Sequence, residues 1–162
     1  MSAAPPAYEL TIPLPHAIPS VLAVGAFLKN TVCVTKGDQA FLSPTIGNLD
    51  SREAITRFED SVERLLDRLE VTPVLVGHDL HPDFHSTRWA QRSGLPTLAV
   101  QHHHAHIAAI AAEHQVEEPV LGLSLDGFGL GPGNQSWGGE LLLTSGADYQ
   151  RLGHLADMAQ PG

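Results

Sequence analysis

The chain has 162 residues, 43% of them apolar, and a formal net charge of −9. That length and composition predict one domain or two small lobes with a sizeable core. Because acidic residues outnumber basic ones by 18 to 9, we expect no direct binding to nucleic acid. No apolar run reaches the roughly 20 residues that span a bilayer, and the N-terminus lacks the basic start and apolar core of a signal peptide. We therefore expect a cytoplasmic protein without membrane contact.

The first part of the chain reads as a lead-in followed by short strands. Residues 1–19 are rich in Pro and Ala and predict a loosely ordered segment. Three β-prone stretches follow at 21–28, 31–35 and 40–42, separated by turn chemistry at Lys29-Asn30 and at 36–38. This order predicts three antiparallel strands in a meander.

A helix is predicted over residues 51–70. Its apolar residues recur at helical spacing, and charged residues occupy the remaining face. Asp50 followed three residues later by Glu53 indicates a capping box at its start, with Asp in place of Ser or Thr. The apolar stripe consists of Ile55, Phe58, Val62, Leu65, Leu66 and Leu69.

Strands and helices then alternate. Short apolar runs predict buried strands, and the stretches between them predict helices; the strands are 73–77, 96–101 and 120–125, and the helices are 86–93 and 102–115. Two β-rich segments, 137–144 and 149–154, end the chain. This layout predicts an α/β fold with a mixed sheet covered by helices. Because the last strands look like a restart of the first block, we expect one lobe over 20–118 and the incomplete start of a similar lobe over 119–162.

Four of the ten histidines fall between positions 102 and 106, where a helix is predicted to begin. His102 and His106 are four residues apart, so both imidazoles would lie on one helix face, close enough to share a metal ion. Asp126, at the end of the next predicted strand, supplies a candidate third ligand. Two nitrogens and one oxygen suit Zn²⁺ or Fe²⁺. Partly buried, hydrogen-bonded packing residues are the structural alternative.

Two further polar segments follow predicted strands. Glycines 127, 129 and 131, directly after Asp126, would let backbone amides approach an anion, although a turn without ligand explains them equally well. Gly138 and Gly139 add two flexible positions, for which close strand packing is the alternative. Residues 78–85, which contain three histidines, could line a cleft or, less readily, hold a second metal.

Several stretches together resemble the carbamoyltransferase region of HypF, the hydrogenase-maturation family. The resemblance covers about residues 19–162, and the histidine cluster followed by Leu-Asp-Gly is its most specific part. The matching stretches are 100–107 (VQHHHAHI), 123–127 (LSLDG), 137–140 (WGGE), 151–155 (RLGHL), 25–31 (GAFLKNT), 79–82 (DLHP) and 86–87 (ST).

The resemblance implies an actin-like ATPase, ribonuclease H-like lobe. It implies metal binding by His102, His106 and Asp126, with a further family ligand beyond residue 162. It also implies ATP or carbamoyl-adenylate binding, with Gly127, Gly129, Gly138 and Gly139 near the nucleotide. In the family, the carbamoyl group passes from carbamoyl-adenylate to a cysteine thiol of the partner HypE, on the way to the cyanide ligands of NiFe-hydrogenase.

Other parts of such proteins have no counterpart here. The acylphosphatase-like domain, the paired-Cys zinc motifs and the adenylate-forming domain are not recognisable, and most of the second lobe is missing. We therefore expect little turnover by this chain alone. A non-catalytic metal-binding or protein-interaction module derived from the lobe is the alternative function. We also expect an open sheet edge near residues 120–125 that a second copy of the chain or a partner could cover.

Overall fold

The structure, a computed structural model, describes residues 6–156. Contacts divide the chain into two compact units, Met1–Val100 and Gln101–Gly162. The ends of the predicted first and last segments, residues 1–5 and 157–162, lie outside the described residues. Among the described residues, no helix combines the length and the apolar character needed to cross a membrane.

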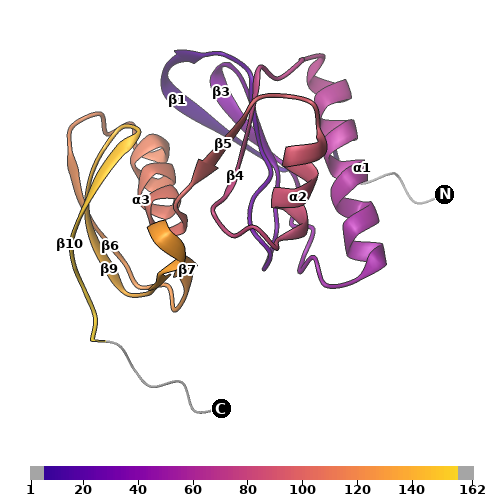
Figure 1. The fold of residues 1–162 in the computed structure, drawn as a ribbon. Coiled ribbons are helices and arrows are strands. Elements are labelled where there is room, and N and C mark those ends of the chain that lie inside the picture. The colour runs from indigo at the N-terminus through magenta and orange to yellow at the C-terminus, as the bar shows by residue number, and fades with distance from the viewer. Residues whose placement is uncertain (1–5, 157–162) are drawn as a thin grey trace. The chain divides into compact units, whose positions relative to one another are not determined.

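The first unit is a five-stranded mixed sheet in the order β1-β3-β2-β4-β5. Strands β1, β2 and β3 pair antiparallel, and β4 and β5 extend the sheet in parallel. Helices α1 and α2 lie on one face of this sheet (Figure 1), where Phe58 of α1 meets Trp89 of α2 edge to face. The elements are β1 Leu10–Ile18, β2 Val21–Ala23, β3 Cys33–Leu42, α1 Arg52–Leu69, β4 Leu75–Asp79, α2 His85–Arg92 and β5 Thr97–Val100.

The core of this unit lies between the sheet and the helices. Side chains from α1 at helical spacing meet side chains from β2, β3 and β4 there. The buried residues are Leu22, Val24, Val32, Val34, Phe41, Ile46, Leu49, Ala54, Phe58, Val62, Leu65, Leu69, Val76 and Ala90. The apolar stripe predicted for residues 51–70 therefore points inward as expected, and four of its six members are buried.

The lead-in predicted for residues 1–19 was wrong for its second half. Leu10–Ile18 forms β1, which pairs with β3 from Leu10 opposite Leu42 to Ile18 opposite Gly37. Pro13 and Pro15 argued against a strand at this position, because proline has no N–H to donate to the hydrogen bonds between strands. An edge strand tolerates proline, and β1 is at the edge of the sheet.

The predicted turn at residues 36–38 is also wrong. The chain continues through it, so 31–35 and 40–42 belong largely to one strand, β3. Gly37 has a φ of 61°, and the register shifts opposite it. A glycine in the left-handed region therefore accommodates an irregularity within the strand rather than a reversal.

Helix α1 begins one residue later than the predicted capping box. Ser51, not Asp50, is the N-cap, and its Oγ accepts a hydrogen bond from the Ala54 amide at 3.2 Å. Glu53 lies in the first turn, where an acidic side chain interacts favourably with the helix dipole.

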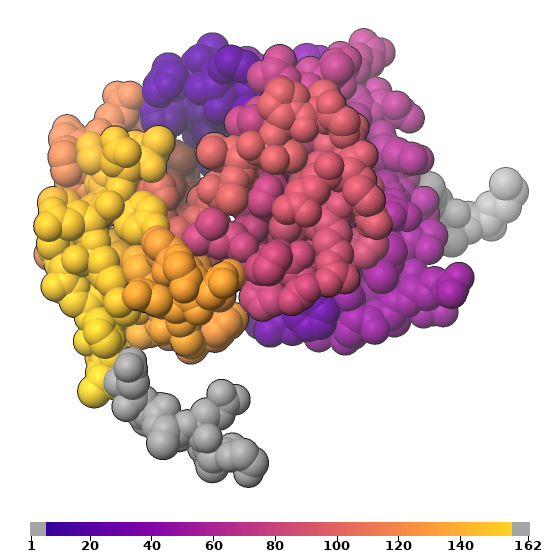
Figure 2. All heavy atoms as spheres, viewed as in Figure 1, coloured from indigo at the N-terminus to yellow at the C-terminus, as the bar shows by residue number. Residues whose placement is uncertain are grey.

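The second unit is an antiparallel sheet in the order β10-β9-β6 with α3 against it. A short ribbon of β7 and β8 follows Asp126. Strand β10, yellow in Figure 2, lies at one edge of the sheet and on the surface. The elements are α3 His102–Glu113, β6 Val120–Ser124, β7 Gly129–Leu130, η1 Pro132–Asn134, β8 Ser136–Trp137, β9 Glu140–Ser145 and β10 Asp148–His154.

Helix α3 packs with the strands that follow it, although we expected it in the first lobe. Its residue Ile107 is buried with Trp137 and Leu142. A Cβ atom at Gly122 of β6 would lie 2.5 Å from Ile107 Cδ1, so the absence of a side chain there lets the helix approach the sheet. By its internal contacts, the chain divides before α3.

Candidate metal centre

His102 and His106 lie on α3, which begins at His102. Their rings are 4.9 Å apart between centroids, at the spacing of one helical turn. Gln101 is the N-cap, and its side chain accepts a hydrogen bond from the His104 amide. The predicted helix start at the histidine cluster is therefore confirmed.

Asp126 lies two residues beyond the end of β6 and faces both imidazoles. Its Oδ2 atom lies 2.7 Å from His102 Nε2 and 3.5 Å from His106 Nε2. The two Nε2 atoms are 3.3 Å apart. Residues that are 24 positions apart in the sequence thus bring three donor atoms together, as the sequence predicted.

These separations fit a divalent cation. In a tetrahedral site with bonds of about 2.0–2.1 Å, neighbouring donors lie about 3.3–3.4 Å apart, close to the two longer separations here. Such a cation would be held by His102 Nε2, His106 Nε2 and Asp126 Oδ2. Among the described residues, this is the one group of His, Cys, Asp or Glu side chains with such convergence.

The site is open to solvent on one side. The side chains of His102, His106 and Asp126 are 20%, 56% and 44% exposed. Three protein ligands with an accessible face leave coordination positions for water or substrate. Burial opposes ionisation of Asp126, but the hydrogen bond from His102 and the Gly127 amide bond outweigh it and lower the pKa of the carboxyl group. Asp126 is therefore an anion suited to a cation.

The other two histidines of the cluster point into the unit. His103 is fully buried, and its Nδ1 atom lies 3.1 Å from Gln101 Nε2. Burial lowers the pKa of His103. His104 Nε2 lies 3.2 Å from the Gly146 carbonyl, and its ring packs against Tyr149. Neither ring belongs to the candidate group of metal ligands.

Three of the four glycines assigned to nucleotide binding have amides that already bond within the chain. The Gly127 amide donates to Asp126 Oδ1, the Gly138 amide to Glu140 Oε1 and the Gly139 amide to the Asp126 carbonyl. At Gly127 alone of these four positions an added Cβ would meet nothing within 4 Å. A ligand near these glycines would therefore use the space left by the absent side chains, because the three amides are already hydrogen-bonded within the chain.

Gly129 and Gly138 are places where protein packs on protein. A Cβ atom at Gly129 would lie 2.7 Å from both His102 Cβ and His103 Cε1. One at Gly138 would lie 2.7 Å from the Gly127 carbonyl oxygen. Both glycines thus keep the loop after β6 close to the first turn of α3 and to the turn before β9.

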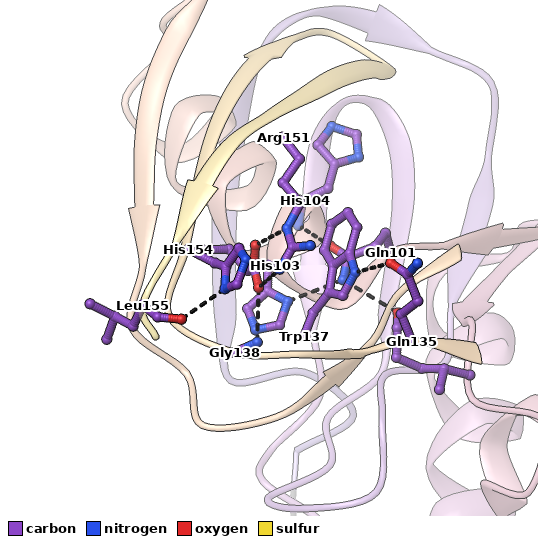
Figure 3. A network of polar contacts seen from close by, with 11 residues as sticks. Gln101, His103, His104, Gln135, Trp137, Gly138, Arg151, His154 and Leu155 are labelled. Atoms are coloured by element: carbon purple, nitrogen blue, oxygen red, sulfur yellow. Dashed lines mark hydrogen bonds and ion pairs between the residues drawn. The ribbon is translucent and has the colours of Figure 1, made fainter. Parts of the chain in front are cut away.

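A buried ion pair, which sequence reasoning missed, supports the same loops. Glu140 is fully buried, and its carboxylate accepts two bonds from the Arg151 guanidinium, at 2.6 and 2.8 Å. The guanidinium also lies 4.2 Å from the Trp137 ring (Figure 3). The sequence did contain a signal for this pair. Glu140 is a single acidic residue at the start of the apolar strand β9, and a buried acidic side chain needs a charged or hydrogen-bonding partner.

The second histidine-rich segment, residues 78–85, forms no such group. His78 Nδ1 contacts the Asp79 carbonyl at 2.7 Å, and the His81 ring stacks on Phe84 at 4.2 Å between centroids. No metal-binding group of the described residues includes them.

Comparison of the chain with models of known protein families shows which family it belongs to. The HypF Kae1-like domain matches residues 16–113, and the second subdomain of the carbamoyltransferase Kae1-like domain matches residues 122–162. The first match covers more than half of the chain and contains both histidines, and the second contains Asp126. The chain belongs to the HypF family.

Known relatives agree and are longer. Carbamoyltransferase HypF2 of Cupriavidus necator is 52% identical over 93% of this chain and 19% of its own length. A carbamoyltransferase HypF homolog of the same organism is 47% identical over 94% of this chain and 40% of its own length. The chain thus spans about a fifth to two fifths of these curated relatives.

Solved structures give the same fold. A full-length HypF in a phosphate- and nucleotide-bound form matches 90% of this chain and 20% of its own, with a TM-score of 0.87 and 42% identity. YeaZ from Pseudomonas aeruginosa matches 84% of this chain and 65% of its own, with a TM-score of 0.51 and 18% identity, a likeness of fold alone. The predicted actin-like, ribonuclease H-like α/β architecture is confirmed.

Proposed function

We propose that this chain forms the metal-binding part of a carbamoyltransferase, which moves a carbamoyl group from carbamoyl-adenylate to a protein cysteine thiol in NiFe-hydrogenase maturation. The observation that carries the proposal is the convergence of His102, His106 and Asp126, whose donor atoms lie no more than 3.5 Å apart. Relatives that are named carbamoyltransferase HypF support the reaction class.

The proposed cation is Zn²⁺ or Fe²⁺, since two imidazoles and a carboxylate suit both. When bound, the metal would act as a Lewis acid toward a carbamoyl or phosphoryl oxygen. His102 is the most enclosed of the three ligands, and His106 and Asp126 border the exposed side. Substrate would therefore approach on the side of His106 and Asp126.

We further propose that ATP or carbamoyl-adenylate binds beside this centre. The solved relative in a phosphate- and nucleotide-bound form supports a nucleotide in this family. Gly127 is the position of this chain best suited to a close approach, because it adjoins Asp126 and has open space where a side chain would be. The acceptor of the carbamoyl group would be a HypE-like protein.

The experiment supplies the rest of a HypF relative in trans. The chain is mixed with a relative that lacks this segment, with ATP, carbamoyl phosphate and a HypE-like acceptor, and carbamoylation of the acceptor is measured by mass spectrometry. We expect no transfer by the chain alone, even with preformed carbamoyl-adenylate, and transfer after mixing. Robust turnover by the chain alone would refute its dependence on other segments.

Variants of α3 make this experiment specific. His106→Ala removes a metal ligand and should abolish restoration. His114→Ala, which removes an exposed histidine at the end of the same helix, should restore transfer as the unmodified chain does. Equal restoration by both variants would contradict a catalytic role for the metal centre.

A non-catalytic metal-binding or protein-interaction module is the second candidate. It would need only the three converging donor atoms of His102, His106 and Asp126. Such a module would bind metal yet restore no transfer in the mixing experiment, whereas a carbamoyltransferase lobe would do both.

We also propose that the chain pairs with a second copy through β6. This strand pairs with β9 on one side, and no strand in the described part of the chain pairs with its other side. Leu121 and Leu123 of β6 are 62% and 60% exposed, and Leu143 beside Leu121 is 38% exposed. An unpaired strand edge beside exposed leucines favours association with another strand.

A further inference from the structure

Gln101 stands directly before the first proposed metal ligand and is almost completely buried, with 3% of its surface exposed. Its Oε1 atom accepts a hydrogen bond from the His104 amide at 2.9 Å. Its Nε2 atom donates to the Leu130 carbonyl of β7 at 3.3 Å and lies 3.1 Å from His103 Nδ1 (Figure 3). One carboxamide thus joins the start of α3, the His103 ring and β7.

These contacts fix the roles of the atoms involved. Because the His104 amide is a donor, the carboxamide oxygen must face it, and the Nε2 hydrogens face Leu130 and His103. His103 Nδ1 is then an acceptor, and the ring proton lies on Nε2. That buried Nε2 makes no hydrogen bond of standard geometry.

Gln101 therefore lies at one end of a path from α3 to β7, which begins three residues after Asp126. The path runs from the carboxamide through the His103 ring to Gly129. Gly129 lets β7 approach the first turn of α3 closely, because a Cβ atom there would lie 2.7 Å from His102 Cβ and from His103 Cε1. The two elements that carry the proposed ligands are thus in contact through buried groups next to those ligands.

The residue type is informative, because glutamine is not among the side chains that usually cap helices. Serine, threonine, aspartate and asparagine are preferred at this position. A capping role alone would be filled by a shorter side chain. The longer side chain of glutamine can accept from the His104 amide and still reach Leu130 and His103 with its nitrogen.

We propose that Gln101 is a positioning residue of the metal centre: its carboxamide holds the first turn of α3, and with it His102, in register with Asp126. This inference rests on the proposed binding of a divalent cation by His102, His106 and Asp126. Groups that orient metal ligands typically change metal affinity by about 10–100-fold when they are replaced.

The variant Gln101→Asn distinguishes the capping of α3 by residue 101 from its proposed positioning of the metal ligands. Asparagine can still accept from the His104 amide, but it is one methylene too short to keep the bonds to Leu130 and His103 as well. We expect helix content close to that of the unmodified chain, and a lower unfolding free energy because the Leu130 carbonyl and the buried His103 ring lose a donor. We expect Zn²⁺ affinity to be about 10–100-fold weaker. The matched control is Gln150→Asn, at an exposed position of β10, which should change neither quantity.

The measurement is competition for Zn²⁺ with a chromophoric chelator, together with the visible absorption spectrum of the Co²⁺-loaded chain. Loss of stability alone would not move the Co²⁺ spectrum of the folded fraction, whereas a displaced His102 would. Unchanged affinity and an unchanged spectrum in Gln101→Asn would overturn the inference and leave the proposed metal site intact. Failure of the unmodified chain to bind Zn²⁺ or Co²⁺ would overturn both.

A second variant tests the other end of the path and covers the case in which Gln101→Asn does not fold. His103→Leu removes the acceptor of the carboxamide and should weaken Zn²⁺ binding to a similar extent. If both residues act through one path, the double variant should bind little more weakly than either single variant. Unchanged affinity in His103→Leu, or independent effects that add in the double variant, would contradict the proposed path.

Discussion

His102 Nε2 donates a hydrogen bond of 2.7 Å to Asp126 Oδ2. The two atoms that would share a cation thus share a proton. Metal binding must displace that proton, because a ligating imidazole nitrogen is unprotonated. The hydrogen bond holds the helix and the loop after β6 in the arrangement that the cation would need.

Asp126→Asn should separate metal affinity from stability. The amide keeps the shape of the side chain but removes its charge and one anionic ligand, so we expect Zn²⁺ affinity to fall by more than about 100-fold. Because the side chain is 44% exposed, metal-free stability should change by no more than about 1 kcal/mol. Asp148→Asn, at an exposed position of β10, is the control for zinc titration and urea unfolding. Similar affinity in both variants would remove Asp126 from the site.

The two glycines nearest to Asp126 should respond differently to alanine. Gly127→Ala meets open space and should change the unfolding free energy by about 0.5 kcal/mol at most, while weakening nucleotide binding if a ligand approaches there. Gly129→Ala presses on His102 and His103 and should cost about 1–3 kcal/mol. Urea unfolding and nucleotide titration of both variants test this. Equal stability of the two would argue against the packing role of Gly129.

Glu140 should contribute to acid sensitivity. Its burial opposes ionisation, but the bonds from Arg151 and from the Gly138 amide outweigh this and hold its pKa below the ordinary value of 4.5. Its stabilisation is therefore fully present above that value and is lost as the pH falls through the lower pKa of the folded state. Unfolding free energies measured between pH 7 and pH 3 should show this loss.

Glu140→Gln is the corresponding variant. It should destabilise the unit at pH 7 by about 3 kcal/mol, because Arg151 loses its buried partner, and it should flatten the acid dependence below about pH 5. Glu113→Gln, exposed on α3, serves as the control. An acid dependence as steep as that of the unmodified chain would show that another group is responsible.

Pairing through β6 predicts a dimer in solution. Leu123→Lys places a charge on the exposed side of this edge strand and should give a monomer in light scattering and sedimentation. Leu28→Lys replaces a leucine that is 65% exposed in the first unit and should leave the dimer intact. A monomeric unmodified chain would contradict the proposed pairing.

The sequence predicted what depends on local periodicity. Helix α1 has an apolar stripe long enough to identify, and His102 and His106 are related by one helical turn, so neither needed information from elsewhere in the chain. Asp126 was found because carboxylates at strand ends commonly approach such sites. Strand β1 was missed because its prolines oppose strand pairing everywhere except at a sheet edge, and its edge position is not visible locally.

The supporting contacts could not be predicted for a related reason. Gln101 reaches a carbonyl 29 residues away, and Glu140 meets Arg151 across a strand pair whose register shifts between Arg151 and Gly153. Such pairings depend on register and loop geometry, which a single sequence does not specify. The three candidate ligands could therefore be named from the sequence, whereas the contacts of Gln101 and Glu140 became visible only in the folded chain.

Zinc titration of the purified chain by calorimetry tests the central claim most directly. The account predicts saturable binding of about one Zn²⁺ per chain, abolished by His106→Ala and preserved in His114→Ala. At a free zinc concentration of about 100 times the dissociation constant, binding should also raise the unfolding free energy by about 2.7 kcal/mol. Absence of saturable binding, or binding that survives loss of His106 unchanged, would contradict it.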